Sequence, residues 1–177
     1  MQNVEFKAEL RDPELARAQC RLIGAGLVGT FRQQDTYYRM PDGRLKKRET
    51  AGAPVEWIFY HRPNLVRPKL SNFTILTDAQ ATTRWGTASL RPWLVVRKTR
   101  ELWMIDNTRI HFDDVEGLGR FLEFEARASA KYSVAECHRI VDHLREQFGP
   151  ALGEPISVGY CDLVDAERRN AEKQPRE

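Results

Sequence analysis

The chain has 177 residues, of which 41% are hydrophobic and 30% are charged, which suggests one globular domain with a sizeable core. Its 28 basic and 25 acidic residues nearly balance at a net charge of +3, which argues against a dedicated nucleic-acid-binding protein with a strong basic excess. No apolar run approaches the ~18–20 residues of a membrane helix, and the N-terminus shows no apolar signal region, so we expect no membrane association.

The three cysteines give no sign of a disulfide framework or a zinc site. Cys20, Cys137 and Cys161 are odd in number, lie far apart and lack Cys-x-x-Cys spacing. Three reduced thiols are typical of a protein kept in a reducing compartment. We therefore expect a cytoplasmic protein.

In the first half of the chain, short strands surround one well-marked helix. Asp12-Pro13-Glu14 has the pattern of an N-cap, a first-turn proline and an acid that suits the helix dipole. Asp78 is the expected cap of a second, short helix that ends near Gly86. The predicted elements are a strand over 4–10, a helix from 13 to about 23, strands within 28–49 with a turn at 41–43, a strand over 55–62, a loop over 67–72 and a helix over 78–86.

The second half predicts a hairpin, a further strand and a long helix. Asp106-Asn107 fits a two-residue hairpin turn. Ser133-Val-Ala-Glu136 is a capping box, and the helix that it opens ends at Gly149. The expected elements are strands over 93–105, 109–114 and 120–127, a helix over 134–148, a last strand over 156–164 and a polar, flexible tail over 165–177, which leaves residues 1–164 as a single domain.

Several predicted strands carry charged residues on one face and apolar residues on the other. Glu123 and Glu125 alternate with Leu122, Phe124 and Ala126, and side chains at alternate positions point to the same face of a strand. The same reading puts eight basic and five acidic residues on the charged faces: Lys7, Arg44, Lys46, Arg48, Arg62, Lys98, Arg100 and Arg109, with Glu5, Glu9, Asp113, Glu123 and Glu125.

The charged face of any one of these strands could simply contact solvent. Acidic residues, however, cluster on some strands and basic residues on others. The apolar stripes of the two helices also need an apolar sheet surface to cover. An α+β fold meets both needs: a closed antiparallel β-barrel with helices outside and charges inside. Since burying an ion costs several kcal/mol, that interior must be a wet tunnel. Grouped carboxylates suit Mg²⁺ or Mn²⁺ and surrounding Arg and Lys suit phosphate oxygens, so the tunnel predicts a metal site and a polyphosphate site.

These residues resemble the CYTH, or triphosphate tunnel metalloenzyme, superfamily. The family signature Glu-x-Glu-x-Lys is matched by Asn3-Val-Glu5-Phe-Lys7 except at its first position, and the closing Glu-x-Glu strand is matched by Glu123-Phe-Glu125. The paired bases Lys46/Arg48 and Lys98/Arg100 follow the family order over roughly residues 3–163. Within the superfamily, His111-Phe-Asp113 with Leu118-Gly119 and Phe121 looks most like the class IV adenylyl cyclase branch.

The resemblance implies a barrel of about eight antiparallel strands and a metal-dependent enzyme acting on triphosphates. A cyclase would convert ATP to cAMP and pyrophosphate; the alternatives are a triphosphatase acting on tripolyphosphate, thiamine triphosphate or a nucleotide, and a non-catalytic nucleotide or polyphosphate binder. A homodimer is left open. The expected roles are catalysis by His111 and Asp113, phosphate binding by Lys7, Arg44, Lys46, Arg48, Arg62, Lys98, Arg100 and Arg109, and Mg²⁺ or Mn²⁺ binding by Glu5, Asp113, Glu123 and Glu125.

Overall fold

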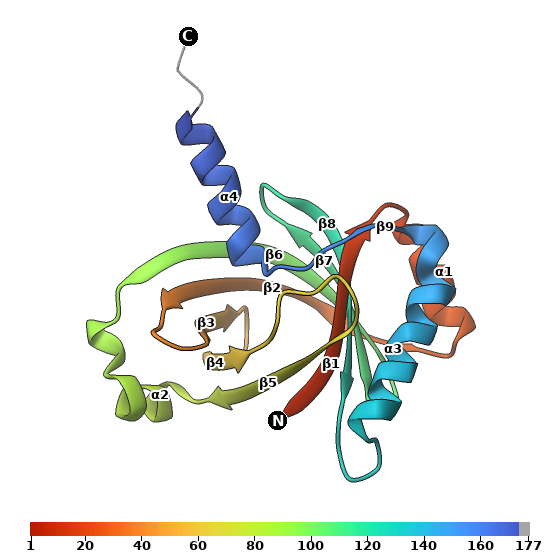
Figure 1. Cartoon of the computed structure of the whole chain (residues 1–177), viewed down its shortest axis with the longest axis horizontal. Coiled ribbons are helices and arrows are strands. Elements are labelled where there is room, and N and C mark those ends of the chain that lie inside the picture. Colours follow the sequence, from red (N-terminus) through yellow and green to blue (C-terminus); the bar gives the residue numbers. More distant parts are fainter. Residues whose placement is uncertain (174–177) are drawn as a thin grey trace.

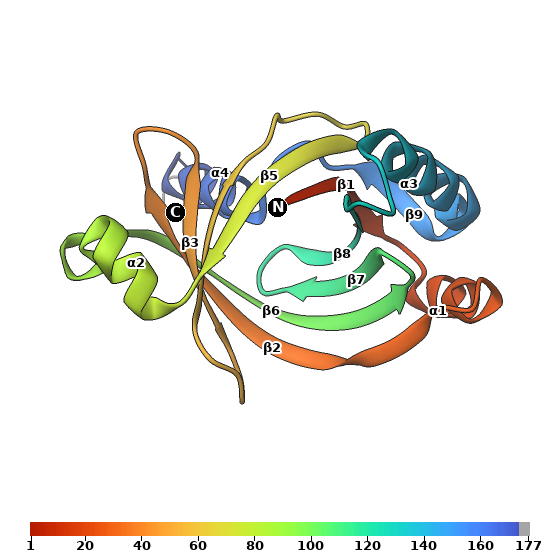
Figure 2. The same ribbon diagram turned by 90° about the horizontal axis from the view of Figure 1, so that it is seen from below.

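Strands with one charged and one apolar face close into an antiparallel barrel in the computed structural model, which describes residues 1–173 (Figures 1 and 2). The fold is α+β, as predicted. The strands of the barrel are β1 (Gln2–Leu10), β2 (Gly26–Arg39), β3 (Arg44–Thr50), β4 (Glu56–His61), β5 (Lys69–Leu76), β6 (Pro92–Ile105), β7 (Thr108–Val115) and β8 (Gly119–Arg127).

The barrel closes where its first strand meets its fifth. The strand order is β5-β4-β3-β2-β6-β7-β8-β1, and β1 also pairs with β5, from Gln2 opposite Asn72 to Glu5 opposite Lys69. A short ninth strand, β9 (Leu152–Pro155), pairs with the far end of β1. Because β1 pairs with three strands, it is the seam of the barrel.

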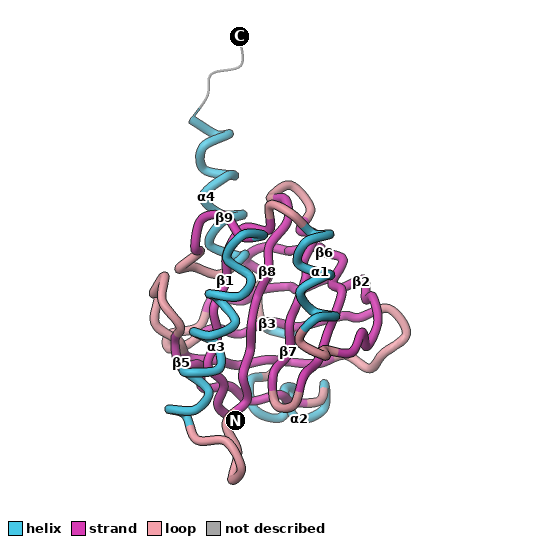
Figure 3. The backbone as a smooth tube through the Cα atoms, turned by 90° about the vertical axis from the view of Figure 1, so that its right-hand side faces the viewer, coloured by secondary structure: helices cyan, strands magenta, loops and turns pink. Residues whose placement is uncertain are grey.

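Within residues 1–173, four α-helices lie outside the barrel: α1 (Pro13–Leu22), α2 (Asp78–Trp85), α3 (Val134–Phe148) and α4 (Tyr160–Lys173). In Figure 3, α1 and α3 lie side by side over the strands around β1 and β8. Phe6, Phe112 and Phe124 face this pair of helices in the largest core cluster, as the alternation predicts. Among the described residues, no helix is long and apolar enough to cross a membrane.

Two of the predicted helix caps are confirmed and one is displaced. The Asp12 carboxylate accepts a hydrogen bond from Leu15 N at 3.0 Å, and Ser133 forms the expected capping box. At α2 the N-cap is Thr77 and not Asp78. Asp78 is the first helical residue, and its Oδ1 instead accepts a 2.8 Å hydrogen bond from the Trp57 indole.

Two sequence-based predictions of secondary structure are wrong. The expected loop over 67–72 contains the first half of β5, which is hard to recognise because its inner face mixes Lys69 and Ser71 with Phe73 and Ile75. The expected last strand over 156–164 is absent, because only 152–155 pair with β1 and the chain then turns into α4. Helix α4 continues past Asp165, where the tail was expected to begin, to Lys173; residues 174–177 lie outside the described part.

The core beneath α3 gives a direct test of the packing. Phe124 is fully buried and its ring lies 6.3 Å from that of Phe6 and 5.2 Å from that of Phe148. Phe124→Ala should lower the free energy of unfolding by about 3–5 kcal/mol, because it leaves a cavity between sheet and helix. Urea unfolding measures the change, with Leu15→Ala on the exposed side of α1 as control. Equal losses in the two variants would contradict this assignment of the core.

Candidate functional site

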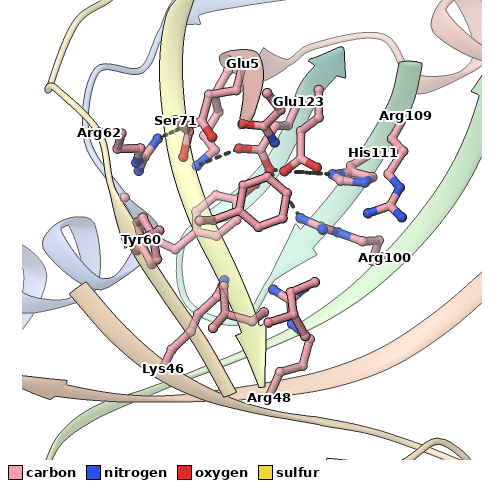
Figure 4. Close-up of a pocket in the computed structure, with 18 of the residues that line it drawn as sticks. Glu5, Lys46, Arg48, Tyr60, Arg62, Ser71, Arg100, Arg109, His111 and Glu123 are labelled. Atoms are coloured by element: carbon pink, nitrogen blue, oxygen red, sulfur yellow. Dashed lines mark hydrogen bonds and ion pairs between the residues drawn. The ribbon is translucent and has the colours of Figure 1, made fainter. Parts of the chain in front are cut away.

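The inner faces of the barrel strands enclose a cavity of about 190 Å³ (Figure 4). A cavity of this size has room for several water molecules. Its wall is made mostly of charged side chains. Those that the sequence predicted and the structure brings to this wall are Glu5, Lys7, Lys46, Arg48, Arg62, Lys98, Arg100, Arg109, His111, Glu123 and Glu125.

Three predicted inward residues lie elsewhere. Arg44 shares a strand face with Lys46 and Arg48, as predicted, but it lies at the end of β3. There its Nη2 lies 3.2 Å from an Asp162 carboxylate oxygen and 3.1 Å from Asn64 Oδ1. Glu9 is half-exposed at the far end of β1, beside Arg11. Asp113 is buried behind the wall and does not line the cavity. The cavity is therefore smaller than the full set of inward positions suggests.

The acidic side of the cavity comes from β7 and β8. Atoms of His111, Glu123 and Glu125 that could ligate a metal ion all lie within 4.8 Å of one another. Glu123 also lies 3.5 Å from the Lys7 ammonium and 3.3 Å from an Arg100 guanidinium nitrogen. Burial would raise the pKa of Glu123, but Lys7, His111 and Arg100 hold it well below its usual range. Glu123 therefore stays ionised at neutral pH.

Two buried polar atoms beside these carboxylates have no hydrogen-bond partner among the described residues. They are Oδ1 of Asn3 and Nδ1 of His111, and both residues line the cavity. Nδ1 of His111 lies 3.6 Å from Glu123 and 3.9 Å from Glu125, beyond hydrogen-bonding distance. Because buried polar groups normally have partners, the two carboxylates with the unpartnered amide oxygen fit a divalent cation. The unpartnered imidazole nitrogen beside them is available to accept a proton.

Glu5 belongs to the same cavity but is ion-paired with Arg62. Its pKa is raised, because burial outweighs the effect of Arg62 and the carboxylates of Glu123 and Glu125 add to the repulsion. An added cation would relieve this repulsion between carboxylates. Glu5 therefore has the electrostatic environment expected of a residue at a metal site.

The basic side of the cavity is held in place by two buried aspartates. The Asp35 carboxylate accepts hydrogen bonds from Arg48 Nε and Nη2, both at 2.7 Å, and from Lys46 Nζ at 2.9 Å. The Asp113 carboxylate accepts two hydrogen bonds of 2.6 Å from Arg100. Lys98 Nζ lies between the two, 3.8 Å from Asp35 and 3.7 Å from Asp113. The two aspartates thus hold these bases on the side away from the cavity, while the bases themselves line it.

The pKa values of the aspartates follow from this pairing. Burial would raise the pKa of both, but Arg48, Lys46 and Lys98 hold that of Asp35 well below its ordinary value, and Arg100 and Lys98 do the same for Asp113. Burial and the neighbouring guanidinium of Arg100 lower the pKa of Lys98. The aspartates are therefore ionised and offset part of the positive charge around the cavity.

Helix α4 adds a cavity residue that sequence reasoning did not find. The Tyr160 hydroxyl donates a 2.7 Å hydrogen bond to Asp113, and the Lys7 ammonium lies 3.9 Å from the centre of the Tyr160 ring. Burial and the Asp113 carboxylate raise the pKa of Tyr160 well above its ordinary value, so the phenol stays protonated. Asp113 therefore has both oxygens engaged, by Arg100 and by Tyr160.

Asp35 was also missed, although the sequence contained a signal for it. Asp35 alternates with Gln33 and Tyr37 on one face of β2, and it lies directly opposite Arg48 in the β2–β3 register. An acid facing the strand that carries the bases is the expected partner. Lys69, on the inner face of β5, donates hydrogen bonds to the backbone oxygens of Leu65 and Ser157.

A family model for the CYTH domain matches residues 1–152. The chain belongs to the CYTH domain family. The match spans the whole barrel, whereas Gly159 and Tyr160, which also line the cavity, lie beyond it. Among curated proteins, none matches this CYTH chain by sequence.

Solved structures share the fold of this CYTH protein at low sequence identity. A candidate adenylate cyclase from Vibrio parahaemolyticus is 17% identical over 92% of this chain and 97% of its own, with a TM-score of 0.72. A conserved hypothetical protein from Pyrococcus furiosus is 16% identical over 91% and 99%, with a TM-score of 0.71. A chain of the Schizosaccharomyces pombe Mediator head module is 12% identical over 88% and 98%, with a TM-score of 0.61. At these identities the likeness shows the fold alone.

The buried Asp35 cluster predicts a pH-dependent contribution to stability. Because the pKa of Asp35 is lower in the folded than in the unfolded protein, its stabilisation is present above about pH 4 and is lost as the pH falls through the folded-state value. Asp35→Asn should lower the free energy of unfolding by about 3–5 kcal/mol at pH 7, since it leaves buried positive charges without a negatively charged partner. The difference from the parent protein should shrink as the pH falls below about 4, the ordinary pKa of an aspartate.

Urea unfolding at pH 7 and pH 3 measures both effects. Asp114→Asn is the matched control, because Asp114 is an aspartate on another barrel strand, β7, with its side chain exposed. A loss below about 1 kcal/mol for Asp35→Asn at pH 7 would contradict this account of how the bases are held.

Proposed function

We propose that this protein is a divalent-metal-dependent enzyme that acts on triphosphates, and that it converts ATP to cAMP and pyrophosphate. The observation that carries the proposal is a cavity with an acidic and a basic region: Glu123 and Glu125 lie beside His111, Lys46, Arg48 and Lys98 form the basic region, and Arg100 lies within 3.3 Å of Glu123. Carboxylates suit a divalent cation and bases suit phosphate oxygens. Membership of the CYTH family and the His111-x-Asp113 pattern support the same reading.

Glu5, Glu123 and Glu125, with the amide oxygen of Asn3, are the residues that would hold Mg²⁺ or Mn²⁺. The ion would supply Lewis acidity at the phosphate undergoing attack. Fixed positive charges around a transferring phosphoryl group lower the barrier because they stabilise charge that develops in the transition state. Lys7, Arg62 and Arg109 complete the set of bases that would perform this work in the cavity.

In the cyclase reaction, the 3′-hydroxyl oxygen of ATP forms a bond to the α-phosphorus. The bond from that phosphorus to the bridging oxygen of the β-phosphate breaks, and pyrophosphate leaves. His111 would accept the hydroxyl proton, since it adjoins the acidic side and burial and Arg100 lower its pKa, which keeps the imidazole neutral. Lys46, Arg48, Lys98 and Arg100 would offset the charge of the departing pyrophosphate.

A triphosphatase is the second candidate. Asp113, expected to act in acid–base catalysis, is held by Arg100 and Tyr160 behind the cavity wall, so fewer groups remain to activate a ribose hydroxyl. In this reaction a water molecule would attack the terminal phosphorus and release orthophosphate. Purified protein with ATP, tripolyphosphate or thiamine triphosphate, each with Mg²⁺ or Mn²⁺, separates the two. Production of cAMP from ATP supports the first, and orthophosphate without cAMP supports the second.

A charge-removing substitution tests the metal site in either reaction. Glu125→Gln keeps the shape of the side chain but removes a ligand charge, so turnover at limiting Mn²⁺ should fall at least about tenfold, equivalent to ~1.4 kcal/mol of transition-state stabilisation. The Mn²⁺ concentration at half-maximal rate should rise. Steady-state assays across a Mn²⁺ titration measure both.

Glu116→Gln is the control for that experiment, since Glu116 is exposed in the turn between β7 and β8. Thermal unfolding of both variants checks that they remain folded. If Glu125→Gln kept the parent rate and the parent Mn²⁺ dependence, the acidic side of the cavity would not be the metal site.

A further inference from the structure

One side of the cavity wall departs from the pattern of charged residues inside and apolar residues outside. On β4 and β5 the inward side chains are Ile58, Tyr60, Phe73 and Ile75. Their outward neighbours on β4, Trp57 and Phe59, pack in a separate apolar cluster with residues of α2. Strand β4 therefore carries apolar side chains on both faces, whereas the residues of β1, β7 and β8 that line the cavity are all polar or charged.

The four inward residues form a continuous strip. Ile58 lies directly opposite Ile75, and Tyr60 lies directly opposite Phe73, in the β4–β5 register. Ile58, Phe73 and Ile75 are each only half-buried, so part of their apolar surface faces the cavity. Apolar surface left in contact with water gains free energy when a ligand covers it. Nothing in an inorganic polyphosphate can cover it in this way.

The strip is joined to the phosphate-binding bases. Ile58 is the direct cross-strand neighbour of Lys46, and Glu56 is that of Arg48. Glu56 lines the cavity at the same end as the strip. A carboxylate there would repel phosphate, but it can accept a hydrogen bond from an amino group of an organic ligand.

Resting on the proposed function, we infer that this strip binds the organic part of the substrate, a planar heterocyclic ring that bears an exocyclic amino group. The triphosphate would lie on the bases of β3 and β6 while the ring covers Ile58, Phe73 and Ile75. Glu56 would accept a hydrogen bond from the amino group. Adenine and the aminopyrimidine of thiamine both have this chemistry, whereas uracil and inorganic tripolyphosphate lack it.

Equilibrium binding in EDTA tests the inference, because metal-dependent turnover does not proceed there. Dissociation constants are measured for ATP, UTP, thiamine triphosphate and tripolyphosphate. Phe73→Ala should weaken ATP binding about tenfold, as loss of a ring that stacks on a base does, and leave tripolyphosphate within about twofold. Ile58→Ala is the second variant and changes the other cross-strand pair of the strip. Thr74→Ala is the control, because Thr74 is exposed on the outer face of β5.

The proposed hydrogen bond between Glu56 and the amino group is tested by comparing ATP with UTP. The parent protein should bind ATP more tightly than UTP, and Glu56→Leu should remove that difference. The arm with thiamine triphosphate shows which of the two ring systems the strip prefers. Equal weakening of ATP and tripolyphosphate by Phe73→Ala and Ile58→Ala would overturn the inference while the triphosphate site stands. If the parent bound none of the four ligands, the proposed function would fail as well.

Discussion

The structure depends on the pairing of two buried aspartates with the bases around the cavity. Like charges gathered inside a barrel repel one another, and each loses part of its hydration. Asp35 and Asp113 offset this cost because each neutralises an arginine and approaches Lys98 without occupying the cavity. The bases keep donors that face the cavity while their charge is balanced from behind. This arrangement permits a barrel whose interior is charged and whose exterior is apolar.

The alternation of charged and apolar residues was enough to predict the barrel and most of the cavity wall. Glu123 and Glu125 on β8 and Lys98 and Arg100 on β6 lie where strand parity places them. The alternation along a strand predicts which side chains point inward, but it does not predict how far along the strand the cavity extends. Arg44 has the correct parity, but it lies at the end of β3, where Asp162 binds it.

Sequence reasoning missed Tyr160 because its role depends on elements far apart in the chain. Tyr160 lay within an expected strand, and only the packing of α4 brings its hydroxyl to Asp113. The first residues of β5 resembled a loop because their inner face is neither uniformly charged nor uniformly apolar. That mixture reflects the change from the charged part of the wall to the strip of Ile58, Tyr60, Phe73 and Ile75. A periodic pattern identifies a uniform face and fails where a face changes character.

The seam at β1 has a consequence for how the chain folds. Residues of β1 pair with β5 through Asn3 and Ser71 and with β8 through Phe6 and Phe124, so the first strand is completed by segments that come much later in the sequence. Loop closure over such separations must precede the contacts that stabilise it, and folds dominated by distant pairings fold slowly. Hairpins such as β6–β7 can form locally, whereas closure of the barrel awaits β8. Until then, at least one edge of β1 is unpaired, which places the risk of intermolecular strand pairing at the start of the chain.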